Sequence, residues 1–141
     1  MNLIKRITLA YLLLPFGAMA QDKGGELVYF VGGNVKQATL EEPASYKLAL
    51  SDLAAAPYIQ MTYKNHDYAI TSYTVSIMSR KFAKVVGQLK QQQGSIVESA
   101  AKMDYTLSTG DRIFIEDLGA FCGKCTGDKN IATKGMVILI E

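Results

Sequence analysis

The feature that most constrains this sequence is the period-two alternation of apolar and polar residues in its middle third. Residues 58–63 alternate in this way, and so does the longer segment Tyr68–Ser79. Because successive side chains of a strand point to opposite faces, this spacing predicts two half-buried β-strands. The early apolar residues of the longer segment, Tyr68 and Ile70, lie out of phase with the later ones. A bulge or bend is therefore expected near Ser72.

Compact apolar runs predict further strands on both sides of this region. They lie at Leu27–Val31, Arg112–Glu116 and Met136–Ile140. Gly32-Gly33-Asn34 marks a turn directly after the first run. The loop Gly119–Asn130 separates the last two runs, and they are expected to pair as an antiparallel hairpin.

Helical spacing is weaker. One short amphipathic helix is expected from Tyr46 to Leu53 with Ser45 as its N-cap, whereas residues 81–107 are ambiguous between helix and strand. Several strands, frequent turns and little helix predict a mainly β fold. We expect an immunoglobulin-like antiparallel β-sandwich with one or two short helices.

The N-terminal segment Met1–Ala20 has the pattern of a secretory signal peptide. Lys5 and Arg6 precede an apolar run, and Ala18-Met19-Ala20 is the small-x-small pattern of a cleavage site. The alternative is a membrane anchor, but the apolar run is about 14 residues, shorter than the roughly 20 that span a bilayer. The mature protein is expected to begin at Gln21, without stable membrane insertion, in the periplasm or outside the cell.

Size and charge limit what the remaining chain can be. Residues 21–141 suit a single β-sandwich domain and leave no room for a second. Without Lys5 and Arg6, 13 basic side chains balance 13 acidic ones. A neutral chain of this kind is not expected to bind nucleic acid.

The motif Cys122-Gly123-Lys124-Cys125 is the most conspicuous candidate for chemistry. A redox-active dithiol is one interpretation, but a turn follows where a thioredoxin-type site needs a helix. A zinc site needs four ligands, and no second cysteine pair exists within the chain. We therefore expect a structural disulfide between Cys122 and Cys125 in an oxidising compartment.

The other candidate residues do not predict a catalytic site. His66 stands beside Asp67 in a polar turn without the context of a nucleophile, and Glu116 and Asp117 are adjacent on a strand and so point to opposite faces. Gly32-Gly33 lacks a phosphate-binding frame. The seven tyrosines after residue 20 could stack on sugars or peptides, but more often fill half-buried pleats. No catalytic residue, metal or cofactor is expected.

Two segments carry a resemblance to a known family. Tyr73–Met78 (YTVSIM) and Leu107–Ala120 (LSTGDRIFIEDLGA) resemble the C-terminal domain of the GldM/PorM family, in which a V-S-F-type strand precedes an L-x-x-G-D-x-[IV]-x-[FI]-E-D-[IL]-x-A run. The resemblance begins at Tyr68, and the Cys122–Cys125 loop is not part of it. It implies a β-sandwich from a periplasmic component of gliding motility or type IX secretion. Such a domain contacts other proteins and has no catalytic residues.

These observations together predict an exported adaptor or scaffold domain that binds another envelope protein. A sheet edge is the expected contact surface, because its unpaired N–H and C=O groups accept a partner strand. The candidate edge strand comprises Leu27, Val28, Tyr29, Phe30 and Val31. The alternative is a small periplasmic binding module for a peptide, glycan or lipid, which would show a tyrosine-lined pocket. The sequence does not indicate an oligomeric state.

Overall fold

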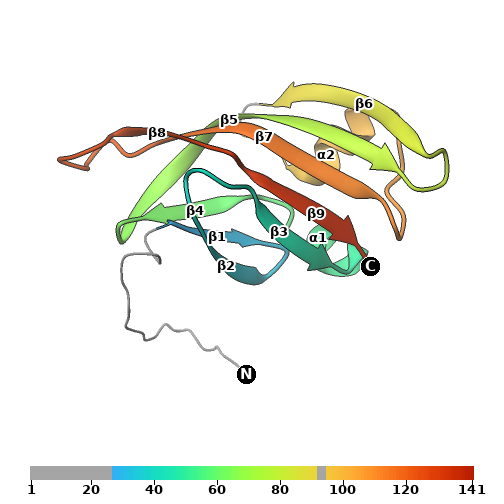
Figure 1. Cartoon of the computed structure of the whole chain (residues 1–141), viewed down its shortest axis with the longest axis horizontal. Coiled ribbons are helices and arrows are strands. Elements are labelled where there is room, and N and C mark those ends of the chain that lie inside the picture. The colour runs from blue at the N-terminus through green and yellow to red at the C-terminus, as the bar shows by residue number, and fades with distance from the viewer. Residues whose placement is uncertain (1–26, 92–94) are drawn as a thin grey trace.

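The computed structural model describes residues 27–91 and 95–141, so the predicted signal peptide and Gln21 lie outside the described residues. The described chain is mainly β, with nine strands and two short helices (Figure 1). Their bounds are β1 Leu27–Val31, β2 Asn34–Ala38, β3 Ala44–Leu48, α1 Leu50–Ala55, β4 Gln60–Tyr63, β5 His66–Ser79, β6 Lys84–Gln91, α2 Ile96–Lys102, β7 Arg112–Phe121, β8 Asn130–Thr133 and β9 Met136–Ile140.

The strands form two facing layers that share β5, which confirms the expectation of a sandwich-like fold. The strand order is β2-β1-β4-β5-β7-β9-β3, with β6 paired to β5 and β8 paired to β7. The first part of β5 pairs with β4, and its later part pairs with β6. In Figure 1, β1, β2 and β4 accordingly lie on one side of the layer formed by β5, β7 and β9.

The bend in β5 lies where the sequence predicted it. The register with β7 is irregular between Ile70 and Ser72 and again between Ser72 and Thr74. Tyr68 and Tyr73, five positions apart, are both buried, and this is the change of phase seen in the sequence. The irregularity lets one strand turn its apolar face toward the same core in both layers.

The hairpin formed by the last strands is also confirmed, with a kink. β7 pairs with β9 along Arg112–Ile115 and with β8 along Leu118–Phe121. Gly135 lies between β8 and β9 with φ +77°, and a Cβ there would lie 1.9 Å from the carbonyl oxygen of Ile115. The chain can therefore approach β7 this closely only with glycine at this position.

The segment around Tyr46 differs from expectation in two ways: it is a strand rather than a helix, and its pairing is parallel rather than antiparallel. Tyr46 lies on β3, which pairs with β9 in parallel, so the sheet is mixed. The prediction of a helix beginning after Ser45 was wrong, because α1 begins at Leu50 and its N-cap is Ala49. The distant partner β9 supplies backbone hydrogen bonds to this segment and overrides its helical spacing.

The predicted edge strand is not an edge. Leu27–Val31 does form a strand, but β1 pairs with β2 on one side and with β4 on the other. Leu27, Tyr29 and Val31 are almost fully buried. The sequence hid the neighbouring strand because β2 has no buried residue and hence no apolar alternation.

The ambiguous region from residue 81 to 107 contains one strand and one helix. β6 is followed by α2, whose N-cap is Ser95; the Ser95 hydroxyl accepts from Glu98 N, and the Glu98 carboxylate accepts from Ser95 N. Met103, just after α2, packs against β6 so closely that a Cβ on Gly87 would lie 2.8 Å from its sulfur. Among the helices of the described chain, none is long and apolar enough to cross a membrane.

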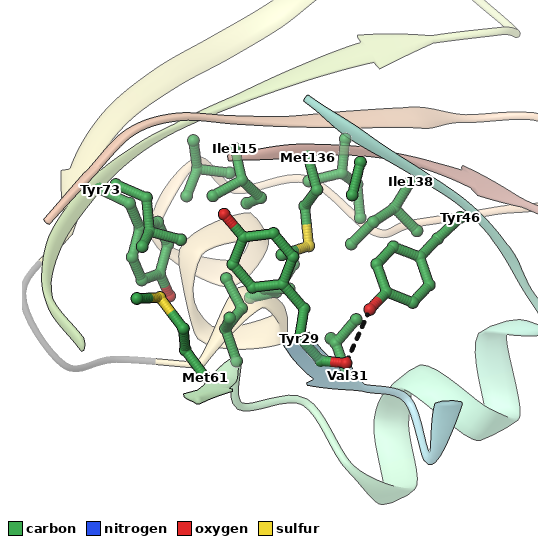
Figure 2. Packing of buried hydrophobic residues seen from close by; sticks show 14 of the residues in the cluster. Tyr29, Val31, Tyr46, Met61, Tyr73, Ile115, Met136 and Ile138 are labelled. Carbon is green, nitrogen blue, oxygen red and sulfur yellow. Dashed lines mark hydrogen bonds between the residues drawn. The ribbon is translucent and has the colours of Figure 1, made fainter. Parts of the chain in front are cut away.

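Tyrosines occupy the core between the layers (Figure 2). The Tyr46 hydroxyl donates to the carbonyl oxygen of Tyr29 at 3.2 Å, and the Tyr29 hydroxyl lies 2.6 Å from that of Thr133. Burial raises the pKa of Tyr29 and Tyr46 above the ordinary value, and burial, with a smaller effect of Glu98, raises the pKa of Tyr73 to about 12. These hydroxyl groups are therefore protonated at neutral pH.

Candidate functional site

The predicted disulfide joins Cys122 and Cys125 in the connection between β7 and β8, with Cα atoms 5.5 Å apart. Cys122 N donates to the carbonyl oxygen of Lys129 at 2.8 Å. From β5, the Tyr68 hydroxyl donates to the carbonyl oxygen of Asp128. The loop is thus fixed by one covalent bond and by hydrogen bonds to its own chain and to a neighbouring strand.

Burial of the disulfide argues against redox chemistry. Cys122 and Cys125 are only 3% and 5% exposed, whereas disulfide exchange requires that a thiolate reach one of the sulfur atoms. Metal binding has no support either, because residues 27–91 and 95–141 contain no group of three His, Cys, Asp or Glu side chains able to hold an ion.

The other titratable pairs are dispersed. His66 and Asp67 begin β5 after a two-residue turn, and adjacent strand residues point to opposite faces. Glu116 and Asp117 are both exposed at a bulge in β7, where Asp117 has φ +52°. The structure brings neither pair to a nucleophile or into a pocket that it describes.

The tyrosines do not form a ligand-binding surface. Five of them are buried, namely Tyr29, Tyr46, Tyr63, Tyr68 and Tyr73. Tyr58 is exposed, and Tyr105 is half-buried. The expectation that most tyrosines fill the pleats of the sheet is therefore confirmed.

A different surface stands out at the opposite end of β5, around the turn into β6. We call residues Arg80–Val85 (RKFAKV) the basic hairpin. Its apolar side chains Phe82 and Val85 are 53% and 51% exposed, although their size would favour burial. The Lys81 ammonium lies 5.5 Å from the centre of the Phe82 ring. Two exposed apolar side chains close together in sequence and among cations make this turn a candidate binding surface.

A groove adjoins the basic hairpin. It has a volume of about 320 Å³ and lies between the hairpin and the segment Met103–Tyr105 that follows α2. Phe82, Val85 and Met103 give its walls an apolar part, and Lys84 and Asp104 give them charge. This volume is at the small end of ligand pockets, so it suits one or two inserted side chains.

The base of the hairpin is held by a buried carboxyl group. Asp111, which is fully buried, accepts at Oδ1 from Arg80 N and at Oδ2 from Ser108 N and the Tyr105 hydroxyl. The Tyr105 hydroxyl also lies 2.9 Å from the Ser79 hydroxyl, which accepts from Phe82 N. Such a satisfied network fixes the backbone while the side chains at the tip stay in solvent.

β6 supplies backbone groups beside the same surface. Among the strands of the described chain it pairs with β5 alone, so one side of its backbone has no partner strand. The pairing shifts register between Gly87 and Val85, which leaves Val86 as a bulge. The site therefore combines an open sheet edge, two exposed apolar side chains and a small groove. Such a combination can hold an extended chain.

The sequence did not single out this site. Phe82, Val85, Val86 and Leu89 are at helical spacing, which concealed the strand. The usable signal was the run of cations around one aromatic residue.

Comparison with protein-family models, with curated proteins and with solved structures finds no match. The resemblance to the GldM/PorM family stays a prediction from the two quoted segments.

Proposed function

We propose that this protein is an exported, periplasmic adaptor domain that binds another envelope protein and catalyses no reaction. The observation that supports this most directly is the exposed apolar pair Phe82 and Val85 beside the open edge of β6. Open edges and exposed apolar patches are the features through which sheet domains bind extended segments of other proteins.

Export is supported by two independent features. The leader pattern of residues 1–20 predicts secretion, and the Cys122–Cys125 disulfide fits an oxidising compartment. Intact mass of the envelope-localised protein tests this directly, and a chain beginning at Gln21 is expected. A species that retains Lys5 and Arg6 would show that the segment is an anchor.

The contact surface differs from the one expected from the sequence. β1 has no free edge, so a partner strand cannot add to Leu27–Val31 without displacing β2 or β4. β6 has a free edge and carries its exposed apolar residues next to the groove. We therefore place partner binding at β6. The resemblance to GldM/PorM directs the search for partners to gliding and type IX secretion components.

Site-specific photo-crosslinking in the native host tests the proposal. A photoreactive amino acid is placed at Val85 on β6 or, as the matched control, at Val35 on β2, whose side chain is 63% exposed. We expect a discrete protein adduct from position 85 and none from position 35. Phe82→Ser should reduce the adduct at position 85 while leaving the circular dichroism spectrum unchanged.

Two results would contradict the proposal. Equal adducts from both positions would show that capture reflects exposure alone. No adduct at either position, together with a small molecule that copurifies and binds the groove, would favour the alternative of a binding module for a peptide, glycan or lipid. The groove beside Tyr105 is the observation that keeps this alternative in view.

A further inference from the structure

The charge of the β5–β6 region is far from that of the chain as a whole. Residues 68–97 contain no Asp or Glu, yet they carry Arg80, Lys81, Lys84 and Lys90. Residues 21–141 balance to zero, so these four cations are a local excess. All four side chains are exposed. An oppositely charged partner would gain attraction here over a range set by the ionic strength.

The cations and the apolar residues lie along the β5–β6 turn and β6. Lys81 and Lys84 flank Phe82, and the pairing of Val85 with Met78 and of Lys90 with Thr74 places both on the partly exposed face of the sheet. The groove itself includes Asp104 as well as Lys84. An acidic side chain inserted into the groove would therefore meet the carboxylate of Asp104 as well as the ammonium of Lys84.

A second copy of this chain is a poor occupant of the same edge. Two β6 strands placed side by side would bring Lys84 and Lys90 against cations of the other copy, and like charges on facing strands are destabilising. Edge lysines and the bulge at Val86 are also the devices by which sheets avoid pairing with themselves. A partner strand must offset these charges to bind.

From these observations we infer the chemistry of the partner segment, an inference that rests on the proposed function. The segment is extended and acidic, pairs along β6, and inserts one apolar side chain into the groove between Val85 and Met103. Its Asp or Glu residues flank the apolar one and meet Lys81 and Lys84. The groove thus limits the size of the inserted side chain, and the surrounding cations favour a partner segment of negative charge.

Synthetic ten-residue peptides test this. Each carries a fluorescent label and a central Leu, with the flanking positions all Glu, all Ser or all Lys, and binding to the purified exported protein is followed by fluorescence anisotropy at low and high salt. We expect the Glu-flanked peptide to bind, with affinity that falls as salt is added, and the Lys-flanked one not to bind. Replacing the central Leu of the Glu-flanked peptide by Gly should abolish its binding.

Charge reversal provides the matched comparison. Lys81→Glu/Lys84→Glu should lower the affinity for the Glu-flanked peptide by about tenfold or more, because two exposed ion pairs become repulsive. The same variant should bind the Lys-flanked peptide. Lys124→Glu/Lys134→Glu, exposed cations outside the site, should change neither affinity by more than about twofold.

Three outcomes would overturn the inference. They are equal binding of the Ser- and Glu-flanked peptides, self-association through β6 in sedimentation, and binding to phosphatidylserine vesicles without binding to any peptide. If peptides fail while the crosslink at Val85 persists, the acidic segment is wrong and the adaptor function stands. If both fail, the proposed function falls as well.

Discussion

The two ends of β5 are fixed in different ways. At its first residues, Tyr68 ties the β7–β8 connection to β5, and a buried disulfide closes that connection on itself. At its last residues, Asp111 holds the backbone of the β5–β6 turn from below, while Phe82 and its neighbouring cations stay exposed. The first of these loops is held by a covalent bond within its own tip. A loop fixed at its base keeps its outer side chains available for binding.

The largest expected effect is a loss of stability at alkaline pH, which should affect both ends of β5 together. Burial raises the pKa of Tyr29, Tyr46 and Tyr73 above the ordinary 10.0, so the unfolded chain loses these protons first as pH rises. Their contribution to stability is complete below pH 10 and is lost as the pH climbs toward 12. Urea midpoints at pH 8 and pH 11 measure this fall.

Two phenylalanine variants sharpen that test. Tyr46→Phe should reduce the fall between the two pH values, whereas Tyr58→Phe, at an exposed position, should change it little. Hydrogen exchange should show the two ends losing protection together. An unchanged midpoint at pH 11 would show that proton loss from these tyrosines does not lower the stability of the fold.

The second expected effect concerns the base of the basic hairpin alone. Asp111→Asn should cost about 2–3 kcal/mol of the free energy of unfolding, because the two carboxylate oxygens both accept and an amide NH₂ in either orientation faces a donor. Chemical denaturation measures the loss. The matched control is Asp128→Asn in the disulfide loop, an exposed side chain expected to stay within about 0.5 kcal/mol. Equal losses would remove the distinction between the two ends.

The third effect concerns the stapled end. Cys122→Ser/Cys125→Ser should cost at most about 1–2 kcal/mol, since a loop this short restrains the unfolded chain only modestly. Photo-crosslinking at Val85 should be unchanged, because the disulfide lies at the other end of β5. Loss of that adduct with the fold intact would show that the disulfide loop contributes to partner binding.

The smallest effect compares one backbone position in each loop. Ala83 has φ +54°, a left-handed conformation that disfavours a Cβ, so Ala83→Gly should stabilise the protein by about 0.5–1 kcal/mol. Gly123 in the disulfide loop has no positive φ, and a Cβ there would make ordinary contact with Phe121, so Gly123→Ala should be neutral within about 0.5 kcal/mol. Thermal melting measures both. Destabilisation by Ala83→Gly would mean that the greater conformational entropy glycine loses on folding outweighs the relief of backbone strain at this position.

The elements that could be predicted are those whose own side chains record their burial. β5 has one buried and one exposed face, so its alternation and its bend were legible in the sequence. β9 and the start of β7 are equally regular. The disulfide was predictable because its two cysteines are close in sequence and have no other partner in the chain.

The missed features depend on partners that local sequence does not contain. β3 is a strand because β9 lies beside it, and β1 is central because β2 pairs with it without burying a side chain. The candidate site was missed for a different reason. Val86 bulges out of β6, so the strand loses its period of two at the very residues that face the groove.

The parallel pairing of β3 with β9 has a consequence for the order of folding. Ala44 pairs with Met136, 92 positions later, and no other strand of the described chain pairs with β3. Closing so long a loop is entropically costly, and contacts of high sequence separation slow folding. β3 therefore waits for β9 before it can pair, whereas β1, β2 and β4 pair with one another and with β5. For a polypeptide that crosses a membrane before it folds, this delay keeps β3 unpaired until β9 has been synthesised.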